Sequence, residues 1–142
     1  MKITVATCKI KKQVESILRS SLDEIITIHR NTHDMISGTV PNEGTDIHCF
    51  QNFQESIENL RDFKEKRIRI SLSICIDGFP LYKKTKYSVT PIQLHIRSLS
   101  AHSRCKKKNN IIVALIGGSA KPSEKIMKTI FEKNLTISVL IS

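Results

Sequence analysis

The chain has 142 residues, of which 39% are hydrophobic and 25% are charged, and its formal net charge is +10. This length predicts a single domain that buries roughly two thirds of its unfolded surface. No stretch approaches the run of about 20 apolar residues that a transmembrane helix needs, and Lys9, Lys11 and Lys12 interrupt the start of the chain before a signal peptide could develop. We therefore expect no membrane association.

The positive charge is concentrated in the C-terminal part of the chain. Residues 1–60 contain six Lys and Arg against eight Asp and Glu, whereas residues 61–142 contain seventeen against five. This asymmetry favours a polyanionic partner such as DNA, because lysines and arginines that neutralise phosphates release condensed counterions. The alternative is a soluble basic domain whose lysines face water. The sequence points to no small-molecule substrate and indicates no oligomeric state.

The four cysteines form no C-x-x-C pair, which favours a reduced, intracellular chain, with the nucleus as one option. His48-Cys49 together with His102 and Cys105 could in principle supply four zinc ligands. The spacing within His48-Cys49 is too tight for a usual zinc knuckle, so packing or surface roles are favoured for these residues.

The N-terminal part predicts one helix and then a loop. Between residues 9 and 29 apolar side chains recur at steps of three and four, which is the spacing of one helical face. We therefore expect a helical segment over residues 1–30 and a glycine- and proline-containing loop or linker over residues 31–45. The main domain is expected at residues 46–142, beginning with a short irregular or helical stretch up to about residue 62.

Beyond residue 68 the sequence changes from a helical to a strand-like period. Residues 68–76 alternate apolar and polar side chains and predict a strand with one apolar face. Asp77-Gly78 is typical of a turn after that strand, and Pro80 is expected to prevent regular strand pairing of the residues after the turn. Residues 89–99 predict a second strand.

The last third of the chain predicts a strand, a helix and a strand. Residues 111–116 are apolar on both faces, which indicates a strand inside the sheet. A helix is expected to open at Pro122 or Ser123, because Glu124 in its first turn suits the helix dipole. Residues 135–141 predict a final strand. The expected fold class is therefore α/β, with the order β-β-β-α-β after a helical segment.

An ordered set of short motifs covers about half of the chain. It comprises a strand at Leu72–Ile76, then Asp77-Gly78-Phe79-Pro80-Leu81-Tyr82, Lys84-Thr85-Lys86, Pro91-Ile92, Leu99, Arg104-Cys105-Lys106, Asn110-Ile111-Ile112 and Gly118-Ser119-Ala120-Lys121-Pro122. With this order and spacing, residues 70–135 resemble the catalytic core of CACTA (En/Spm)-type transposases and their animal relatives. The chain departs from the family pattern at Thr90, where the family has Trp, at Ser100, where it has Pro, and at residues 114–116, which lack the usual aromatic side chain.

The resemblance implies a partial RNase H-like fold, in which Asp77 would be the first carboxylate of a DDE-type active site. Such enzymes use Mg²⁺ or Mn²⁺ held by several carboxylates to stabilise the attacking and leaving oxygens of phosphodiester chemistry. The second carboxylate would be expected at the end of the fourth strand, near Ser142. We therefore expect Asp77 to be a remnant catalytic and metal-ligand position, the metal not to be held tightly, and the chain to lack transposase activity by itself.

Seven basic residues are candidates for contact with DNA. They lie in two clusters, Lys83, Lys84 and Lys86 after Asp77, and Arg104, Lys106, Lys107 and Lys108 before the third predicted strand. Solvated loops are the alternative interpretation of both clusters. The sequence thus predicts a fragment or degenerate copy of a mobile-element DNA transposase, and a non-catalytic basic DNA-associating protein is the alternative.

Overall fold

The computed structural model describes residues 3–58, 70–81, 86–119 and 121–134. In chain order the elements are β1 (Thr4–Thr7), α1 (Ile10–Ile36), the 3-10 helix η1 (Ile47–Cys49), α2 (Gln51–Glu58), β2 (Leu72–Ile76), β3 (Phe79–Pro80), β4 (Ser88–Ile96), α3 (Ala101–Arg104), the 3-10 helix η3 (Lys107–Asn109), β5 (Asn110–Gly118) and α4 (Glu124–Asn134). The structure combines helices with an antiparallel sheet, so the predicted mixture of helices and strands is confirmed, while the RNase H-like fold stays a prediction. The strand expected at residues 135–141 lies outside the described residues.

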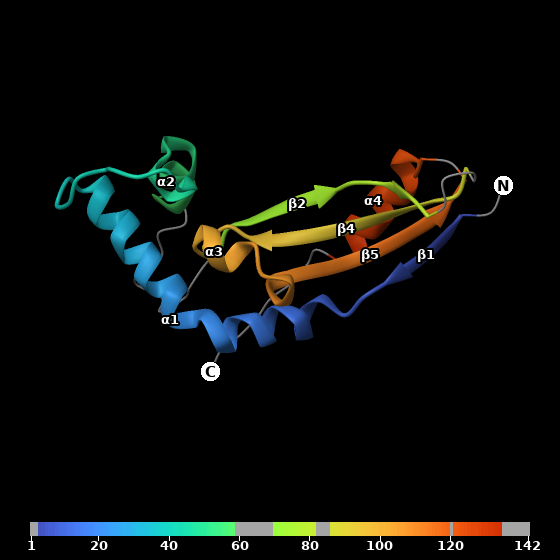
Figure 1. Ribbon diagram of the computed structural model, residues 1–142, viewed down its shortest axis with the longest axis horizontal. Helices are drawn as coiled ribbons and strands as arrows, with labels where there is room; N and C mark the ends of the chain where they lie inside the picture. The colour runs from blue at the N-terminus through green and yellow to red at the C-terminus, as the bar shows by residue number, and fades with distance from the viewer. Residues whose placement is uncertain (1–2, 59–69, 82–85, 120, 135–142) are drawn as a thin grey trace. The chain divides into compact units, whose positions relative to one another are not determined.

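The strands form one sheet with the order β1-β5-β4-β2, and β3 also pairs with β4 (Figure 1). The pairings β1/β5, β4/β5 and β3/β4 are antiparallel. The strand expected at residues 111–116 is β5, and its place between β1 and β4 confirms that it lies inside the sheet. The second expected strand is β4, whose alternate residues Thr90, Ile92, Leu94 and Ile96 are buried.

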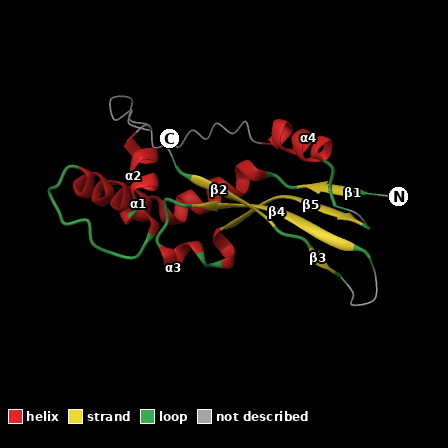
Figure 2. Ribbon diagram, turned by 90° about the horizontal axis from the view of Figure 1, so that it is seen from above, coloured by secondary structure: helices red, strands yellow, loops and turns green. Residues whose placement is uncertain are grey.

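The chain divides into two compact units. The first contains β1, the start of α1 up to Ile17, β3, β5, α4 and most of β2 and β4. The second contains α1 from Leu18 onwards, η1, α2 and the segment Ile96–Asn109. Each unit has its own buried apolar side chains, such as Ile92 and Val113 in the first and Ile25 and Phe53 in the second. In the first unit, α4 lies on one face of the sheet (Figures 1 and 2).

The first helix is confirmed, and it is longer than its apolar periodicity predicts. It continues through polar residues that were expected to begin the loop and ends at Ile36. Gly38 then adopts φ of 75°, a left-handed conformation that favours glycine, and its N–H donates to the carbonyl of Met35. The glycine, and not the change to polar side chains, therefore sets the end of the helix.

The N-terminal strand β1 was not predicted. Its four residues are exposed, so it carries no burial pattern, and pairing with β5 defines it. Beyond Thr7 the pairing continues through a hydrogen bond from Cys8 N to Val113 O, and then through the side-chain amide of Gln13 on α1. That amide donates from Nε2 to the carbonyl of Ile112 and accepts from its N–H at Oε1, both at 2.9 Å. Gln13 therefore takes the place of one strand residue beside β5.

The expected turn at Asp77-Gly78 is wrong, because the chain does not reverse there. Strand β2 already lies beside β4, and β3 then pairs with the same strand at Phe79↔Val89 and Pro80↔Ser88. Continuing this register places Asp77 opposite Pro91. Proline has no N–H to donate, so the ladder is interrupted at that point and resumes in β3. Pro80 is itself paired, in contrast to the sequence prediction, and its place in the two-residue strand β3 suits proline.

Candidate functional site

Asp77 lies directly after β2, and its side chain is exposed. The neighbouring Gly78 comes close to β4, since a Cβ on this glycine would lie 3.0 Å from Thr90 Oγ1. The glycine of the Asp-Gly pair therefore has a structural reason, which is its close approach to β4. By the period of the strands, Asp77 shares its sheet face with Cys75 and Gln93 and not with the buried apolar side chains of β4.

The described surroundings of Asp77 do not fit the two-ion site that the family resemblance implies. Mg²⁺ and Mn²⁺ in such sites need several carboxylate oxygens at fixed geometry. Among the residues that the structure describes, no group of three or more His, Cys, Asp or Glu side chains could hold a metal ion. Two other carboxylates, Glu24 and Asp46, accept hydrogen bonds from protein groups.

The three consecutive lysines Lys106–Lys108, here called the lysine loop, are all exposed. The backbone of this loop is held at both ends by the carbonyl of Ser103. That carbonyl accepts hydrogen bonds from Lys106 N at 3.2 Å and from the side-chain amide of Asn109 at 2.7 Å. Asn109 is buried, with 3% of its surface exposed, and its own N–H donates to the carbonyl of Lys106. The lysine loop thus projects three charges from a fixed backbone.

Arg104 precedes the lysine loop but points into the protein. Its Nη2 donates to Asp46 Oδ1 at 2.5 Å, and its Nη1 donates to the carbonyls of Leu99 and Arg97 at 2.7 and 3.3 Å. Only 18% of the Arg104 side chain is exposed. The guanidinium is therefore engaged by three acceptors within the protein, unlike the three lysines that come after it.

Two carboxylates from distant parts of the sequence hold the turn that leads into the lysine loop. Glu24 on α1 accepts from the backbone N–H and the hydroxyl of Ser100 at 3.0 and 2.5 Å and from the hydroxyl of Ser103 at 2.9 Å. Asp46 accepts from Ala101 N at 3.1 Å in addition to Arg104. The first turn of α3 is thereby capped by two carboxylates and by the Ser100 side chain.

These contacts change the acidity of both carboxylates. Burial alone would raise the pKa of Glu24, but the hydrogen bonds from Ser100 and Ser103 and the charge of Lys106 outweigh it, so the pKa lies below its ordinary value. Burial would likewise raise the pKa of Asp46, and the hydrogen bonds from Arg104, Ile47 and Ala101 lower it overall. Both groups are thus held in their charged form around the turn.

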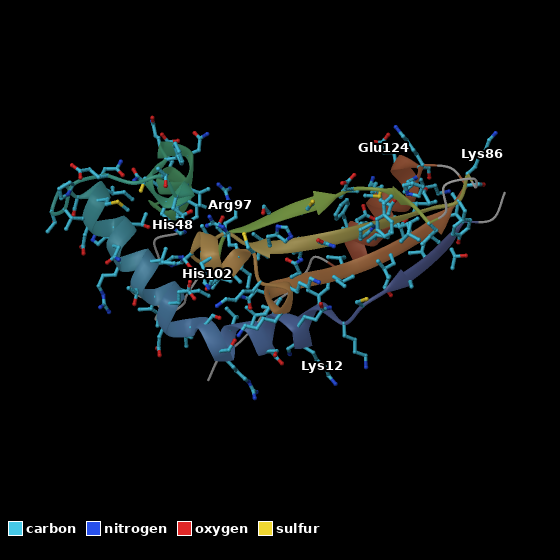
Figure 3. All side chains as sticks on the ribbon, viewed as in Figure 1. Lys12, His48, Lys86, Arg97, His102 and Glu124 are labelled. Atoms are coloured by element: carbon cyan, nitrogen blue, oxygen red, sulfur yellow. The ribbon has the colours of Figure 1, made fainter. Side chains whose placement is uncertain are left out.

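Two histidines belong to the same unit. His48 Nε2 donates to the carbonyl of Arg97 at 3.0 Å, and Figure 3 labels both residues. The His48 Nδ1 lies 3.5 Å from Asp46 Oδ2. His29 Nε2 lies 2.9 Å from Ser98 Oγ, and that oxygen also accepts from Ser71 N. Burial lowers the pKa of both imidazoles, and in His48 this effect outweighs the hydrogen bond to Arg97 and the charge of Asp46, which raise it. Both histidines are therefore neutral structural groups near neutral pH.

The remaining basic candidates are placed in part. Lys86 precedes β4 and is exposed, and Figure 3 shows it at one end of the sheet. Lys83 and Lys84 lie outside the described residues. His102 and Cys105, considered as zinc ligands on sequence alone, are exposed on α3 and directly after it.

Sequence reasoning missed Glu24 and Asp46 as the groups that organise the basic turn. The only local signal was Ser100, three residues before Ser103, which is typical of a helix cap. Nothing in the sequence indicated that carboxylates 76 and 55 residues away from Ser100 and Ala101 would complete that cap.

No protein-family model matches the chain, and neither a curated protein nor a solved structure matches it. In the part of the chain that the structure describes, none of the helices is long and apolar enough for a membrane span.

Proposed function

We propose that this chain is a degenerate copy of a CACTA-type transposase core that associates with duplex DNA and does not cut it. The observation that carries the DNA association is the lysine loop, whose three exposed charges are presented on a hydrogen-bonded backbone in the basic part of the chain. Lysines on a fixed backbone neutralise phosphates without reading base sequence. No Phe, Tyr or Trp occurs in residues 97–110, so stacking on unpaired bases is not favoured and the proposed partner is a duplex.

The order of the elements supports the proposed descent. Strands β2, β4 and β5 are successive neighbours in the sheet, α4 comes next, and Asp77 stands at the end of β2. This agrees with the β-β-β-α order and with the position of the first carboxylate that the resemblance implies. An experimental structure with a different strand order would contradict the proposed descent. A basic DNA-associating protein without transposase ancestry would show the same lysine loop and is the second candidate.

Duplex binding is tested by fluorescence anisotropy with a labelled double-stranded oligonucleotide between 50 and 200 mM salt. The variant Lys107→Gln/Lys108→Gln should reduce the slope of log K against log salt by about 1.8 in magnitude, because each neutralised phosphate contributes roughly 0.9 to that slope. The matched control Lys11→Gln/Lys12→Gln removes the same charge from exposed positions on α1 and should change the slope less. Equal slopes for the two double variants would contradict the role of the lysine loop.

Absence of cutting is tested with supercoiled plasmid in Mg²⁺ or Mn²⁺. The wild-type chain and Asp77→Asn should leave the plasmid equally intact. Metal-dependent nicking by the wild type that is lost in Asp77→Asn would refute the non-catalytic part of the proposal.

A further inference from the structure

We propose that Arg104 is a positioning residue, which together with Asp46 and Glu24 fixes the lysine loop for a duplex phosphate backbone without contacting the DNA. This inference rests on the proposed function and names how its binding surface is built. It also reassigns one of the predicted DNA contacts, because Arg104 was grouped with the lysines on sequence alone.

The Arg104 guanidinium is directed into the protein. Three of its five N–H donors are engaged by Asp46 and the carbonyls of Arg97 and Leu99, and only 18% of the side chain is exposed, so little of the guanidinium is available to a phosphate. A planar guanidinium suits this role, because its fork can bind a carboxylate and carbonyls at the same time. A lysine at the same position would keep the charge but could not reproduce the fork.

Hydrogen bonds connect this pair to the lysine loop. Asp46 and Glu24 hold the backbone at Ala101 and Ser100, and Glu24 also holds the Ser103 hydroxyl. The Ser103 carbonyl in turn holds both ends of the lysine loop. Ser103 therefore joins the half-buried Glu24 to the backbone at both ends of the lysine loop, and all of these residues belong to one compact unit.

The three lysines differ in their distance along the chain from this network. The backbone N–H of Lys106 donates to the Ser103 carbonyl, whereas Lys107 and Lys108 lie one and two residues further along the loop, in η3. We therefore place the test substitutions at Lys107 and Lys108, away from the backbone hydrogen bond of Lys106.

The decisive variant is Asp46→Asn, which raises the net charge by one unit while it removes the strong acceptor for Arg104. Simple electrostatics predicts tighter DNA binding for this variant. Positioning predicts weaker binding by about fivefold, since a loosened loop must be ordered on binding. The matched control Asp23→Asn makes the same charge change at an exposed position on α1 and should bind at least as tightly as the wild type.

Arg104→Lys separates positioning from direct contact. If Arg104 is a positioning residue, this charge-conserving variant weakens binding as much as Asp46→Asn, and combining the two gives little further loss because they disrupt one pair. Asn109→Ala changes no charge and leaves the Arg104–Asp46 pair in place, so it tests the loop even if the other variants fold poorly. It should also weaken binding, with far-UV circular dichroism as the check on folding.

Wild-type binding to a duplex with no salt dependence, or no binding, would refute the proposed function itself. Salt-dependent wild-type binding that Asp46→Asn leaves unchanged or strengthens, as Asp23→Asn does, would overturn only the positioning role. Wild-type affinity in Arg104→Lys together with weaker binding in Arg104→Gln would identify Arg104 as a direct phosphate contact and would also overturn it.

Discussion

Replacing Gln13 by alanine is expected to destabilise the first compact unit, because it removes a side chain that acts as part of the sheet. The Gln13 amide makes two hydrogen bonds of 2.9 Å, one to the N–H and one to the carbonyl of Ile112. The pairing of β4 with β5 shifts register at this place, since Ile92 pairs with Ala114 and Gln93 with Ile112. Ile112 is therefore next to the buried Val113, which the register leaves without a partner on β4. The ladder of β1 ends just before this point, so Gln13 supplies the pairing that β1 does not.

The magnitude of the effect depends on the two bonds and their surroundings. Each intramolecular hydrogen bond contributes about 1 kcal/mol net, so the loss of both costs about 2 kcal/mol. Alanine is the better helix former by a few tenths of a kcal/mol, which offsets a small part. Ile112 is half-buried, so water can satisfy some of the released backbone groups. We therefore expect a loss of about 1.5 kcal/mol in the free energy of unfolding, which lowers Tm by about 5 °C for a chain of this size.

Urea denaturation monitored by circular dichroism measures this change, and Lys12→Ala is the matched control. Lys12 is the exposed neighbour of Gln13 on α1, and its side chain projects from the helix (Figure 3), so its replacement should change stability by less than about 0.5 kcal/mol. Hydrogen exchange gives a local readout, because the Ile112 amide should lose protection in Gln13→Ala. Equal stability of the two variants, with the Ile112 amide still protected, would refute the role given to Gln13.

Two further predictions concern the histidines and a close contact on the sheet. Burial lowers the pKa of His29 and His48, so the unfolded chain takes up protons more readily than the folded one. The free energy of unfolding should therefore fall as the pH drops below 6.5, the ordinary pKa of these histidines. A urea midpoint that stays constant between pH 7.5 and 5.5 would contradict this. A Cβ at Gly117 would lie 2.6 Å from Tyr87 Oη, so Gly117→Ala should destabilise the chain by about 1 kcal/mol, and the same substitution in a Tyr87→Ala background should cost clearly less in a double-mutant cycle.

The elements that could be predicted from the sequence are those whose residues carry their own pattern. Helix α1 shows a repeat of three and four residues, β4 alternates buried and half-buried side chains, and α4 opens with Ser123 Oγ accepting from Ile126 N. In these elements the local sequence and the final environment agree. Strand β1 differs, because its four exposed residues become a strand only through β5.

The errors at the candidate site have a common physical cause, which is a partner far away in sequence. Asp77-Gly78 has the composition of a turn, but the chain runs on from β2 to β3 along the same neighbour, β4. Pro91 on β4 lacks an N–H, and this interrupts the strand pairing at Asp77 without reversing the chain. Arg104 stands close to three lysines, but Asp46, 58 residues earlier, draws its guanidinium into the protein. Composition and spacing describe local preference and do not identify such partners. The exposed lysine loop, by contrast, was predictable because consecutive lysines are rarely buried.

The lysine loop is proposed to bind the phosphate backbone of duplex DNA, and this is the central claim. It is tested most directly by the slope of log K against log salt for the wild-type chain and for Lys107→Gln/Lys108→Gln, measured on the same duplex. The account predicts a steep slope for the wild type and a loss of about 1.8 in the variant. A wild-type slope near zero, or a variant slope equal to that of the wild type, would contradict it.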